Sequence, residues 1–495
     1  MKYDAIIVGS GIAGMTAAGL LALENRKVLI LEQHNIFGGL LQNFRRDRLT
    51  FPTGVHSIGS LSENQVLWRY FEYLGVLDRI SFVEMDRDGF QEFVFEDTTY
   101  EMPTGHKEYA ERLMSYFPDE RQAIDTFMSD MKICMDRSPY YQIDPERVFA
   151  RLPMDTMSLQ DYLDALTTNL ELRCLLAACY PLYGIDPIQC PLVTHFSVLD
   201  SFLNSSYRVD EREKAISKAF TFRLKELGVE MRRSTTVDEI ICEGRIAKGV
   251  RLDDGEVIHG DLVMYSGHPK ELVTLCPKLR PAFKWRVAEL DNTDPFFSVG
   301  LSWSHDVCSS STKDVFIFDT NDLKKAAQPW KVDTQEVPGI LYVAGLPRPE
   351  RGRYSVVAIA AAYHEDWEKW DSTPTGDRGN EYAEKKLACS EKILRRVRQQ
   401  WPEAASSIEL IDSNTPLTLR DYTLSPFGTG YGVKKTVEKM GMSQIGTMTS
   451  VKGLFMIGQS SQLPGIVGTV ISSVVACSNI FGADYMLSKI ARATS

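Results

Sequence analysis

The sequence lacks the features that mark several large classes of protein. It has no C-x-x-C pair among its nine cysteines, and its 55 lysines and arginines fall short of its 66 aspartates and glutamates, giving a net charge of −11. An odd number of scattered cysteines suits free thiols in a reducing compartment better than a secreted disulfide framework. Without surplus positive charge, no general attraction to nucleic acid is expected. No metal-ligand spacing stands out among the histidines, so we predict no metal site.

No targeting or membrane segment is evident either. Met1 to Val8 lacks the apolar stretch and cleavage site of a signal peptide, which predicts a cytoplasmic protein. From Gly453 to Ala483 the chain carries no charged residue, but only Gly465 to Ala483 could form one helix, of about the minimum length that spans a membrane. We expect this helix to be buried inside the protein, with membrane contact as the alternative. The net negative charge does not favour attachment to anionic lipid.

The first 32 residues predict a dinucleotide-binding unit. Asp4 to Val8 is a short apolar run, typical of a parallel strand buried on both faces. A glycine-rich turn from Gly9 to Gly14 follows, then a helical stretch from Met15 to Glu24 and a second strand from Lys27 to Leu31. The turn reads G-x-G-x-x-G between a strand and a helix, which is the context that this fingerprint requires.

Each position of the fingerprint has its own physical role. Gly9 permits the tight turn, Gly11 lets the backbone approach a pyrophosphate, and Gly14 lets the helix lie against the strand. The pyrophosphate would sit at the helix N-terminus, where free N–H groups and the helix dipole meet negative charge. Glu32 is placed to accept hydrogen bonds from a ribose diol, which argues against a 2′-phosphate. A purely structural turn is the alternative.

Two further glycine segments favour FAD over NAD. Gly38-Gly39 would let the backbone approach a longer cofactor that lies extended across the domain, although a structural loop is the alternative. Near the C-terminus, a strand from Lys452 to Gln459 is followed by Leu463 to Gly468, where a helix begins. The N–H groups at that helix end could face the pyrimidine edge of a flavin, where negative charge collects on reduction. An ordinary buried helix is the alternative here.

The rest of the chain shows alternating strand and helix patterns. Strands are expected around 229–232, 236–242 and 246–252, as a three-stranded antiparallel insertion that returns to a parallel sheet at Asp261 to Tyr265. Residues 90–100 suggest one strand, and amphipathic patterns predict helices over Lys107–Asp136, Glu381–Gln400 and from near Asp210. Residues 140–205 have the composition of an apolar chamber or, equally, of a plain helical core.

Together these residues resemble the phytoene desaturase superfamily of flavoproteins. The resemblance rests on the fingerprint, Gly38-Gly39, the run from Thr53 to Gly59 and the Gly458–Gly468 segment. Thr415-Pro416-Leu417-Thr418, Tyr422 and the run from Ser425 to Gly432 look most like the branch of carotenoid isomerases and all-trans-retinol 13,14-reductases (retinol saturases). Many members have a Pro-x-Gly-Gly turn where this chain has Asn204 to Val209, and the resemblance is faint across 90–205 and 276–400.

The resemblance implies an α/β fold: a Rossmann-like FAD-binding domain of amine-oxidase-like topology with a discontinuous α+β substrate domain. The FAD-binding domain is expected to comprise 1–90, 206–275 and 410–495, and the substrate domain 91–205 and 276–409. FAD would be bound non-covalently. The candidate cofactor residues are Gly9, Gly11, Ile12, Ala13, Gly14, Glu32, Gln33, Gly38, Gly39, Leu40, Val55, His56, Val237, Gly267, Gly458, Gln459, Ile466 and Val467.

The implied activity is oxidoreduction at carbon–carbon double bonds of a lipophilic polyene or isoprenoid, by a saturase, desaturase or cis–trans isomerase. Flavin N5 accepts or gives a hydride, so no protein nucleophile is needed, but a proton source or a stabiliser of cationic character is. His56, Tyr422 and Tyr431 are the candidates, each with an ordinary packing role as its alternative. A flavin amine oxidase and a non-catalytic FAD protein are the competing readings. With no second nucleotide fingerprint, electrons would come from another protein or from loosely bound NAD(P)H, and peripheral membrane contact could serve to collect substrate.

Overall fold

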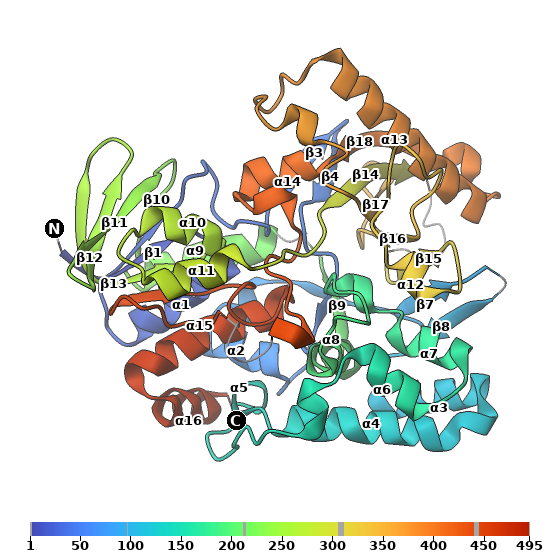
Figure 1. Cartoon of the computed structure of the whole chain (residues 1–495), viewed down its shortest axis with the longest axis horizontal. Coiled ribbons are helices and arrows are strands. Elements are labelled where there is room, and N and C mark those ends of the chain that lie inside the picture. Colours follow the sequence, from blue (N-terminus) through green and yellow to red (C-terminus); the bar gives the residue numbers. More distant parts are fainter. Residues whose placement is uncertain (1, 97, 211–213, 305–310, 440–444, 495) are drawn as a thin grey trace.

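Two seven-stranded sheets organise the molecule (Figure 1). The computed structural model describes residues 2–96, 98–210, 214–304, 311–439 and 445–494, and every structural statement below concerns these residues. The first sheet has the order β10-β2-β1-β13-β12-β11, with β19 paired to β13. The second has the order β18-β14-β17-β16-β15-β7-β8. The α/β fold class expected from the sequence is confirmed.

The first sheet contains the predicted nucleotide-binding unit. β1 pairs in parallel with both β2 and β13, and β19 pairs in parallel with β13. Its strands are β1 (Lys2–Val8), β2 (Val28–Leu31), β10 (Glu230–Arg232), β11 (Val237–Glu243), β12 (Ile246–Leu252), β13 (Val257–Tyr265) and β19 (Leu454–Met456). The antiparallel meander consists of β11, β12 and the start of β13. Including 229–232 in that insertion was wrong, because β10 pairs in parallel with β2 at the opposite edge.

Helices cover both faces of this sheet, as the apolar sequence of its strands requires. Ala5 and Ile7 face a core shared with one set of helices, whereas Ile6 faces a second core under the other set. The first set is α1 (Ile12–Leu23), α2 (Val66–Leu74), α9 (Lys214–Glu226), α15 (Gly465–Phe481) and α16 (Ala483–Ala493). The second set is α10 (Pro269–Leu275) and α11 (Pro281–Ala288). The residues just before α9, where a helix was expected to begin, lie outside the described residues.

The second sheet is mostly antiparallel, with one parallel pair between β15 and β7. Its strands are β7 (Gln91–Val94), β8 (Thr99–Met102), β14 (Phe296–Trp303), β15 (Asp314–Phe318), β16 (Ile340–Gly345), β17 (Tyr354–Ala361) and β18 (Glu409–Asn414). In Figure 1, α13 (Gly379–Gln400) lies above this sheet, and a helical layer lies below it. That layer contains α3 (His106–Tyr116), α4 (Arg121–Asp136), α6 (Leu159–Leu166), α7 (Leu170–Ala177) and α8 (Leu192–Asn204). The short helix α5 (Pro139–Gln142) follows α4 and contacts α15.

Short elements complete the architecture. β3 (Asn43–Arg46) and β4 (Leu49–Pro52) form a hairpin, and β5 (Ile58–Gly59), β9 (Ser206–Val209) and β6 (Phe82–Glu84) form a small antiparallel sheet. Two short helices, α12 (Leu323–Ala326) and α14 (Pro416–Thr423), follow β15 and β18. The single strand expected over 90–100 is a hairpin, β7–β8. The helix expected over 107–136 is broken into α3 and α4, because Pro118 has no N–H to continue the helical ladder.

The uncharged C-terminal segment forms a buried helix, as expected. Val470, Val474 and Cys477 of α15 have no exposed surface, and the helix ends at Gly482, whose φ of 97° breaks it from α16. Within the described ranges, no helix combines the length and the apolar character needed to cross a bilayer.

Candidate functional site

A cavity of about 730 Å³ reaches from the N-terminus of α15 to the second sheet. Gly465, Ile466 and Val467 line it at the helix end. Apolar side chains of the second sheet line it on the other side, among them Phe296, Phe316, Ile340, Val357 and Ile359. The cavity therefore joins a segment predicted to hold the cofactor to an apolar surface that could hold a lipophilic molecule.

The three glycine segments, far apart in sequence, converge in space. A Cβ built on Gly39 would lie 3.1 Å from the Cα of Gly11, so the second glycine pair sits directly against the fingerprint turn. A Cβ on Gly458 would lie 3.9 Å from the Cβ of Ala13, which brings the C-terminal segment to the same helix end. The side chain of Ser473 in α15 also donates to the carbonyl of Ala13 at 2.8 Å. The convergence that the cofactor prediction requires is present.

The two helix N-termini at this point fit a dinucleotide. α1 begins after Gly11, where no side chain caps the helix and an added Cβ would meet nothing within 4 Å. α15 begins after Pro464 with no side-chain cap, and Gly465 likewise has open space around its Cα. By contrast, a Cβ on Gly14 would come within 2.1 Å of the carbonyl oxygen of Gly9. Uncapped N–H groups beside open space are what a pyrophosphate and an electron-rich ring edge require.

Glu32 has a structural role beside its predicted one. One carboxylate oxygen accepts hydrogen bonds from the amide (2.9 Å) and hydroxyl (2.6 Å) of Ser10, and the other accepts from the amide of His34 at 2.9 Å. The Ser10 hydroxyl in turn accepts from the amide of Gly38 at 3.1 Å. Glu32 thus ties the fingerprint turn to the second glycine pair. The oxygen that accepts from His34 can accept one further hydrogen bond, and contact of Glu32 with a ribose stays a prediction.

The remaining cofactor candidates fall into two groups. Leu40, Val55 and His56 line the cavity with Gly39, Ile466 and Val467. The others lie around the fingerprint turn or at the neighbouring strand ends, outside the cavity lining: Gly9, Gly11, Ile12, Ala13, Gly14, Glu32, Gln33, Gly38, Val237, Gly267, Gly458 and Gln459. Among these, Gln459 donates its side-chain amide to the carbonyl of Gly430 at 3.4 Å.

The three catalytic candidates occupy different places. His56 lines the cavity, and burial together with the charge of Arg208 lowers its pKa to about 3, so its ring is neutral near pH 7. Tyr431 also lines the cavity, but its hydroxyl donates to the carbonyl of Pro181 at 3.1 Å. Tyr422 is 52% exposed at the edge of the cavity, where its ring stacks on His34. The structure therefore brings His56 and Tyr431 into the cavity wall and leaves Tyr422 at its rim.

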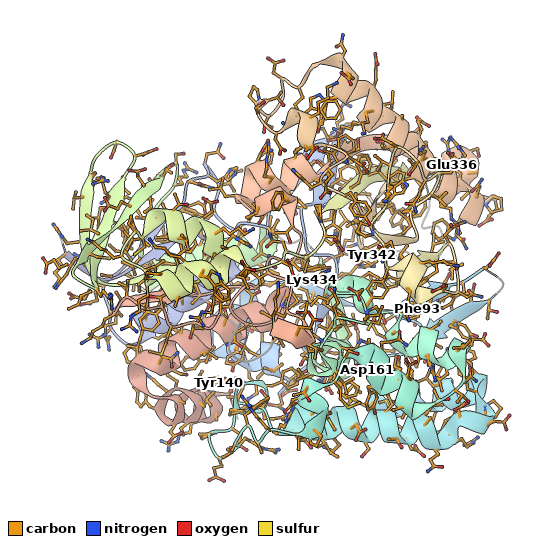
Figure 2. The ribbon with its side chains drawn as sticks, in the orientation of Figure 1. Phe93, Tyr140, Asp161, Glu336, Tyr342 and Lys434 are labelled. Carbon is orange, nitrogen blue, oxygen red and sulfur yellow. The ribbon has the colours of Figure 1, made fainter. Side chains whose placement is uncertain are left out.

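A buried charged network stands behind His56. Arg208 and Asp314, 2% and 0% exposed, form an ion pair at 3.1 Å. Asp314 also accepts hydrogen bonds from the hydroxyls of Tyr342 (2.8 Å) and Ser57 (2.7 Å), both of which line the cavity. Arg208 donates to the carbonyl of His56 at 2.9 Å, so the network fixes the loop that carries this histidine. Tyr342 is labelled near the centre of the molecule in Figure 2.

Asp294 adds a carboxyl group to the cavity wall, just before β14 and beside Phe296. Burial raises the pKa of Asp294; the nearby charge of Lys434 opposes this rise, while Asp186 and Glu365 add to it. Asp294, Asp314 and Tyr342 were not among the candidates predicted from the sequence. An Asp-Pro step directly before an apolar strand was the only local signal for the first of them.

Comparisons with known proteins agree with this geometry. Residues 7–74 match the family model described as an NAD(P)-binding Rossmann-like domain. The chain is 23% identical to an all-trans-retinol 13,14-reductase from Danio rerio, over 98% of this chain and 87% of that protein. It is 24% identical to a chloroplastic prolycopene isomerase from Arabidopsis thaliana, over 99% of this chain and 84% of that protein.

The fold is also that of a solved amine oxidase. Putrescine oxidase, in a structure with bound putrescine, aligns with a TM-score of 0.64 at 15% identity, over 97% of this chain and 99% of that one. This likeness concerns the fold alone. The protein is an enzyme, and its near-full-length similarity to a retinol reductase and a prolycopene isomerase agrees with the resemblance to the phytoene desaturase superfamily predicted from the sequence.

Proposed function

We propose that this chain is an FAD-dependent oxidoreductase that acts on carbon–carbon double bonds of a lipophilic conjugated polyene or isoprenoid, as a saturase, desaturase or cis–trans isomerase. The observation that carries the proposal is the cavity, which joins the open N-terminus of α15 to an apolar wall of the second sheet. The near-full-length similarity to enzymes named for retinol and prolycopene supports the substrate class.

FAD would be held by the three converging glycine segments. The uncapped amides of α1 would bind the pyrophosphate, Glu32 the ribose, and the first amides of α15 the pyrimidine edge of the flavin. When bound, the flavin supplies two-electron redox chemistry at N5. Its electrons would come from another protein or from loosely bound NAD(P)H. The proposed FAD-binding domain remains 1–90, 206–275 and 410–495, and the proposed substrate domain 91–205 and 276–409.

Asp294 is the side chain we propose as the proton-handling group. Its carboxyl lines the cavity, and burial raises its pKa, so the protonated form persists to higher pH than for an exposed aspartate. A protonated carboxyl can give a proton to a polyene carbon, and the ionised form can take one back. The same group can therefore serve saturation, desaturation or isomerisation, and tuning of this kind is common at catalytic sites.

The wall formed by Tyr342 and Ser57 would stabilise positive charge on the polyene. Both hydroxyls donate their hydrogen to Asp314, so they face any other neighbour only with oxygen lone pairs. Burial and the charge of Asp314 raise the pKa of Tyr342 well above its usual value, which keeps this phenol protonated. Neutral His56 adds a further uncharged polar ring beside Tyr342, with 5.6 Å between ring centroids. The oxygen lone pairs of Tyr342 and Ser57 suit an electron-deficient chain beside them.

The test is anaerobic reduction of the FAD-loaded protein, followed by mass spectrometry of candidate polyenes after incubation. A gain of two hydrogens indicates a saturase, a loss of two with the oxidised protein a desaturase, and unchanged mass with altered geometry an isomerase. Turnover of primary amines with consumption of oxygen, and no change in any polyene, would instead favour an amine oxidase. A peripheral membrane contact in the cytoplasm would suit collection of such substrates, and co-sedimentation with vesicles measures it.

A further inference from the structure

One strand of the cavity wall connects a region with acidic side chains to a region with basic ones. Asp294 lies just before β14, whose Phe296, Ser298 and Gly300 follow it along the cavity wall. A rise of about 3.3 Å per residue places Gly300 roughly 20 Å from Asp294. Gly300 pairs with Asp412 of β18. A ligand that reached both ends of this wall would therefore be a long, extended chain.

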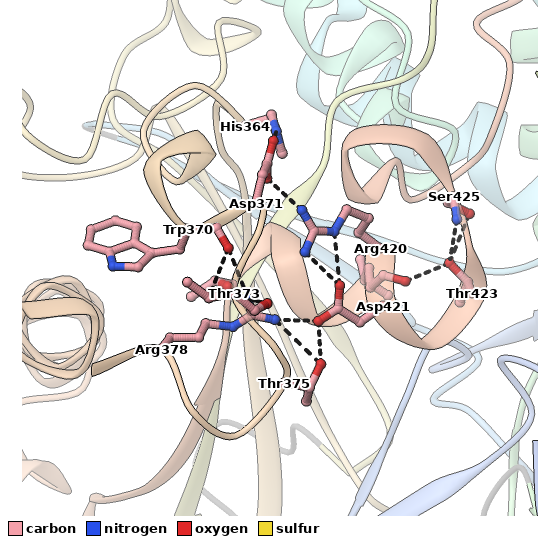
Figure 3. Close-up of polar contacts among 12 residues, drawn as sticks. His364, Trp370, Asp371, Thr373, Thr375, Arg378, Arg420, Asp421, Thr423 and Ser425 are labelled. Carbon is pink, nitrogen blue, oxygen red and sulfur yellow. Dashed lines mark hydrogen bonds and ion pairs between the residues drawn. The ribbon is translucent and has the colours of Figure 1, made fainter. Parts of the chain in front are cut away.

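Positive charge gathers at the Gly300 end. Among the described residues that line the cavity, three carry a permanent positive charge: Arg46, Arg378 and Lys386. Figure 3 shows that the guanidinium of Arg378 is already committed to Asp421, to the carbonyls of Trp370 and Thr373, and to threonine hydroxyls. Asp421 is also bound by Arg420, which pairs in turn with Asp371 at 2.6 Å. This network is balanced, with two arginines and two aspartates, and it leaves no net charge for a ligand.

Arg46 and Lys386 are not balanced in the same way. Both approach Asp412, but the carboxylate already accepts from Arg46 at 2.8 Å and from the amide of Ser413 at 2.8 Å. The Lys386 ammonium is 3.9 Å from the nearer oxygen of Asp412, at the outer limit of an ion pair. Two cations and one carboxylate leave one net positive charge at the cavity wall. Burial lowers the pKa of Lys386; the charge of Asp412 opposes this shift, and the charge of Arg46 adds to it.

We propose that Lys386, with Arg46 beside it, binds an anionic end group, a carboxylate, of the extended polyene on which the enzyme acts. The inference rests on the proposed function and names the substrate class more closely: a polyene with an acidic end group, lying along β14 with its carboxylate at Lys386 and its chain directed toward Asp294. At the other end the acidic side chain of Asp186 lines the cavity and repels a carboxylate, so the two ends together fix the direction of binding.

The test compares two ligands that differ only in the end group. Parinaric acid and its methyl ester are titrated by equilibrium dialysis at pH 7 against the full chain loaded with FAD. A charge-assisted contact at a partly exposed lysine favours the acid by roughly five- to tenfold in Kd. Lys386→Met should remove this preference by weakening the acid alone, and Lys386→Arg should keep it. Lys107→Met is the matched control, since Lys107 is an exposed lysine of α3 that pairs with Glu111 at 3.7 Å.

The outcomes separate this inference from the proposed function. Equal binding of acid and ester by the unaltered protein, or equal weakening of both by Lys386→Met, overturns the end-group site and leaves the polyene proposal standing. Binding of neither ligand overturns both the end-group site and the polyene substrate class. The flavin content of each variant, read from its absorption spectrum, should be the same, because Lys386 lies outside the three glycine segments.

Discussion

Replacing Asp314 by asparagine tests the buried network that supports His56. The substitution keeps the shape of the side chain but removes the negative charge that compensates Arg208, whose side chain is 2% exposed. Removing one partner of a buried ion pair typically costs about 3–5 kcal/mol, because the other charge is left uncompensated. Arg208 keeps the carbonyls of Ser311, Lys313 and His56, so we expect the lower end, a loss of about 3 kcal/mol in the free energy of unfolding.

Tyr342→Phe provides the internal comparison. It removes one hydrogen bond to Asp314, at 2.8 Å, and leaves the ion pair intact. A hydrogen bond to a charged group contributes about 1.5–3 kcal/mol, and Asp314 retains Ser57 and Arg208, so the expected loss is about 1.5 kcal/mol. Urea denaturation followed by circular dichroism measures both variants. If Asp314→Asn lowers the free energy of unfolding no more than Tyr342→Phe does, the charge of Asp314 is not the main contribution of this network to stability, and the reasoning is refuted.

Further predictions follow from individual positions. Gly11→Val should leave unfolding unchanged, since its Cβ meets open space, but should abolish FAD retention; Gly14→Val should destabilise the fold, since its Cβ would lie 2.1 Å from the Gly9 carbonyl oxygen. Flavin absorbance measures FAD retention in the two variants, and urea denaturation measures their stability. Equal losses of stability in Gly11→Val and Gly14→Val would contradict the prediction. The raised pKa of Asp294 means that its protonated form is lost at higher pH than for an ordinary aspartate. The rate of saturation should therefore fall as the pH rises through that pKa, and the rate of Asp294→Asn should show no such fall. His56 stays neutral above pH 4, so the pH profile of the reaction rate should have the same shape near pH 6.5 in the unaltered protein and in His56→Gln. A limb near pH 6.5 that disappears in His56→Gln would show that the histidine becomes charged there.

The nucleotide-binding half could be predicted from the sequence because its geometry is encoded locally. Gly9, Gly38 and Gly39 have φ values of 96°, 124° and 56°, which are backbone conformations that favour glycine, so the motif states the shape of the turn directly. The apolar strands before the turn and after the helix indicated that the turn lies at the edge of a parallel sheet. The convergence of the three segments follows from the same local signals, once the strands that carry them are placed in one sheet.

The part of the cavity wall that contains Asp294, Ser57 and Tyr342 could not be predicted, because its contacts are long-range. Arg208 and Asp314 are separated by 106 positions, and no spacing pattern connects them. Asp294 becomes a candidate for proton transfer only when the burial of its carboxyl group and the neighbouring charges are known. His56 was named because it belongs to a glycine-rich segment, and Tyr422 was named as a weaker candidate that lies at the rim of the cavity. The catalytic roles of both stay predictions.

The misread elements have simple physical causes. The pattern of apolar residues continues across Pro118, so one amphipathic helix was expected where proline ends α3 and a second helix begins. β10 precedes the meander closely in sequence, but its pairing partner β2 lies about 200 positions earlier, and pairing over that distance leaves no local trace.

The central claim is that three distant glycine segments bind one FAD per chain. Titration of the cofactor-free protein with FAD, followed by dialysis and an absorption spectrum, tests it most directly. The account predicts a retained flavin spectrum at one equivalent per chain, with FAD released intact on acid denaturation. A protein that stays colourless after dialysis against excess FAD, while remaining folded by circular dichroism, would contradict it.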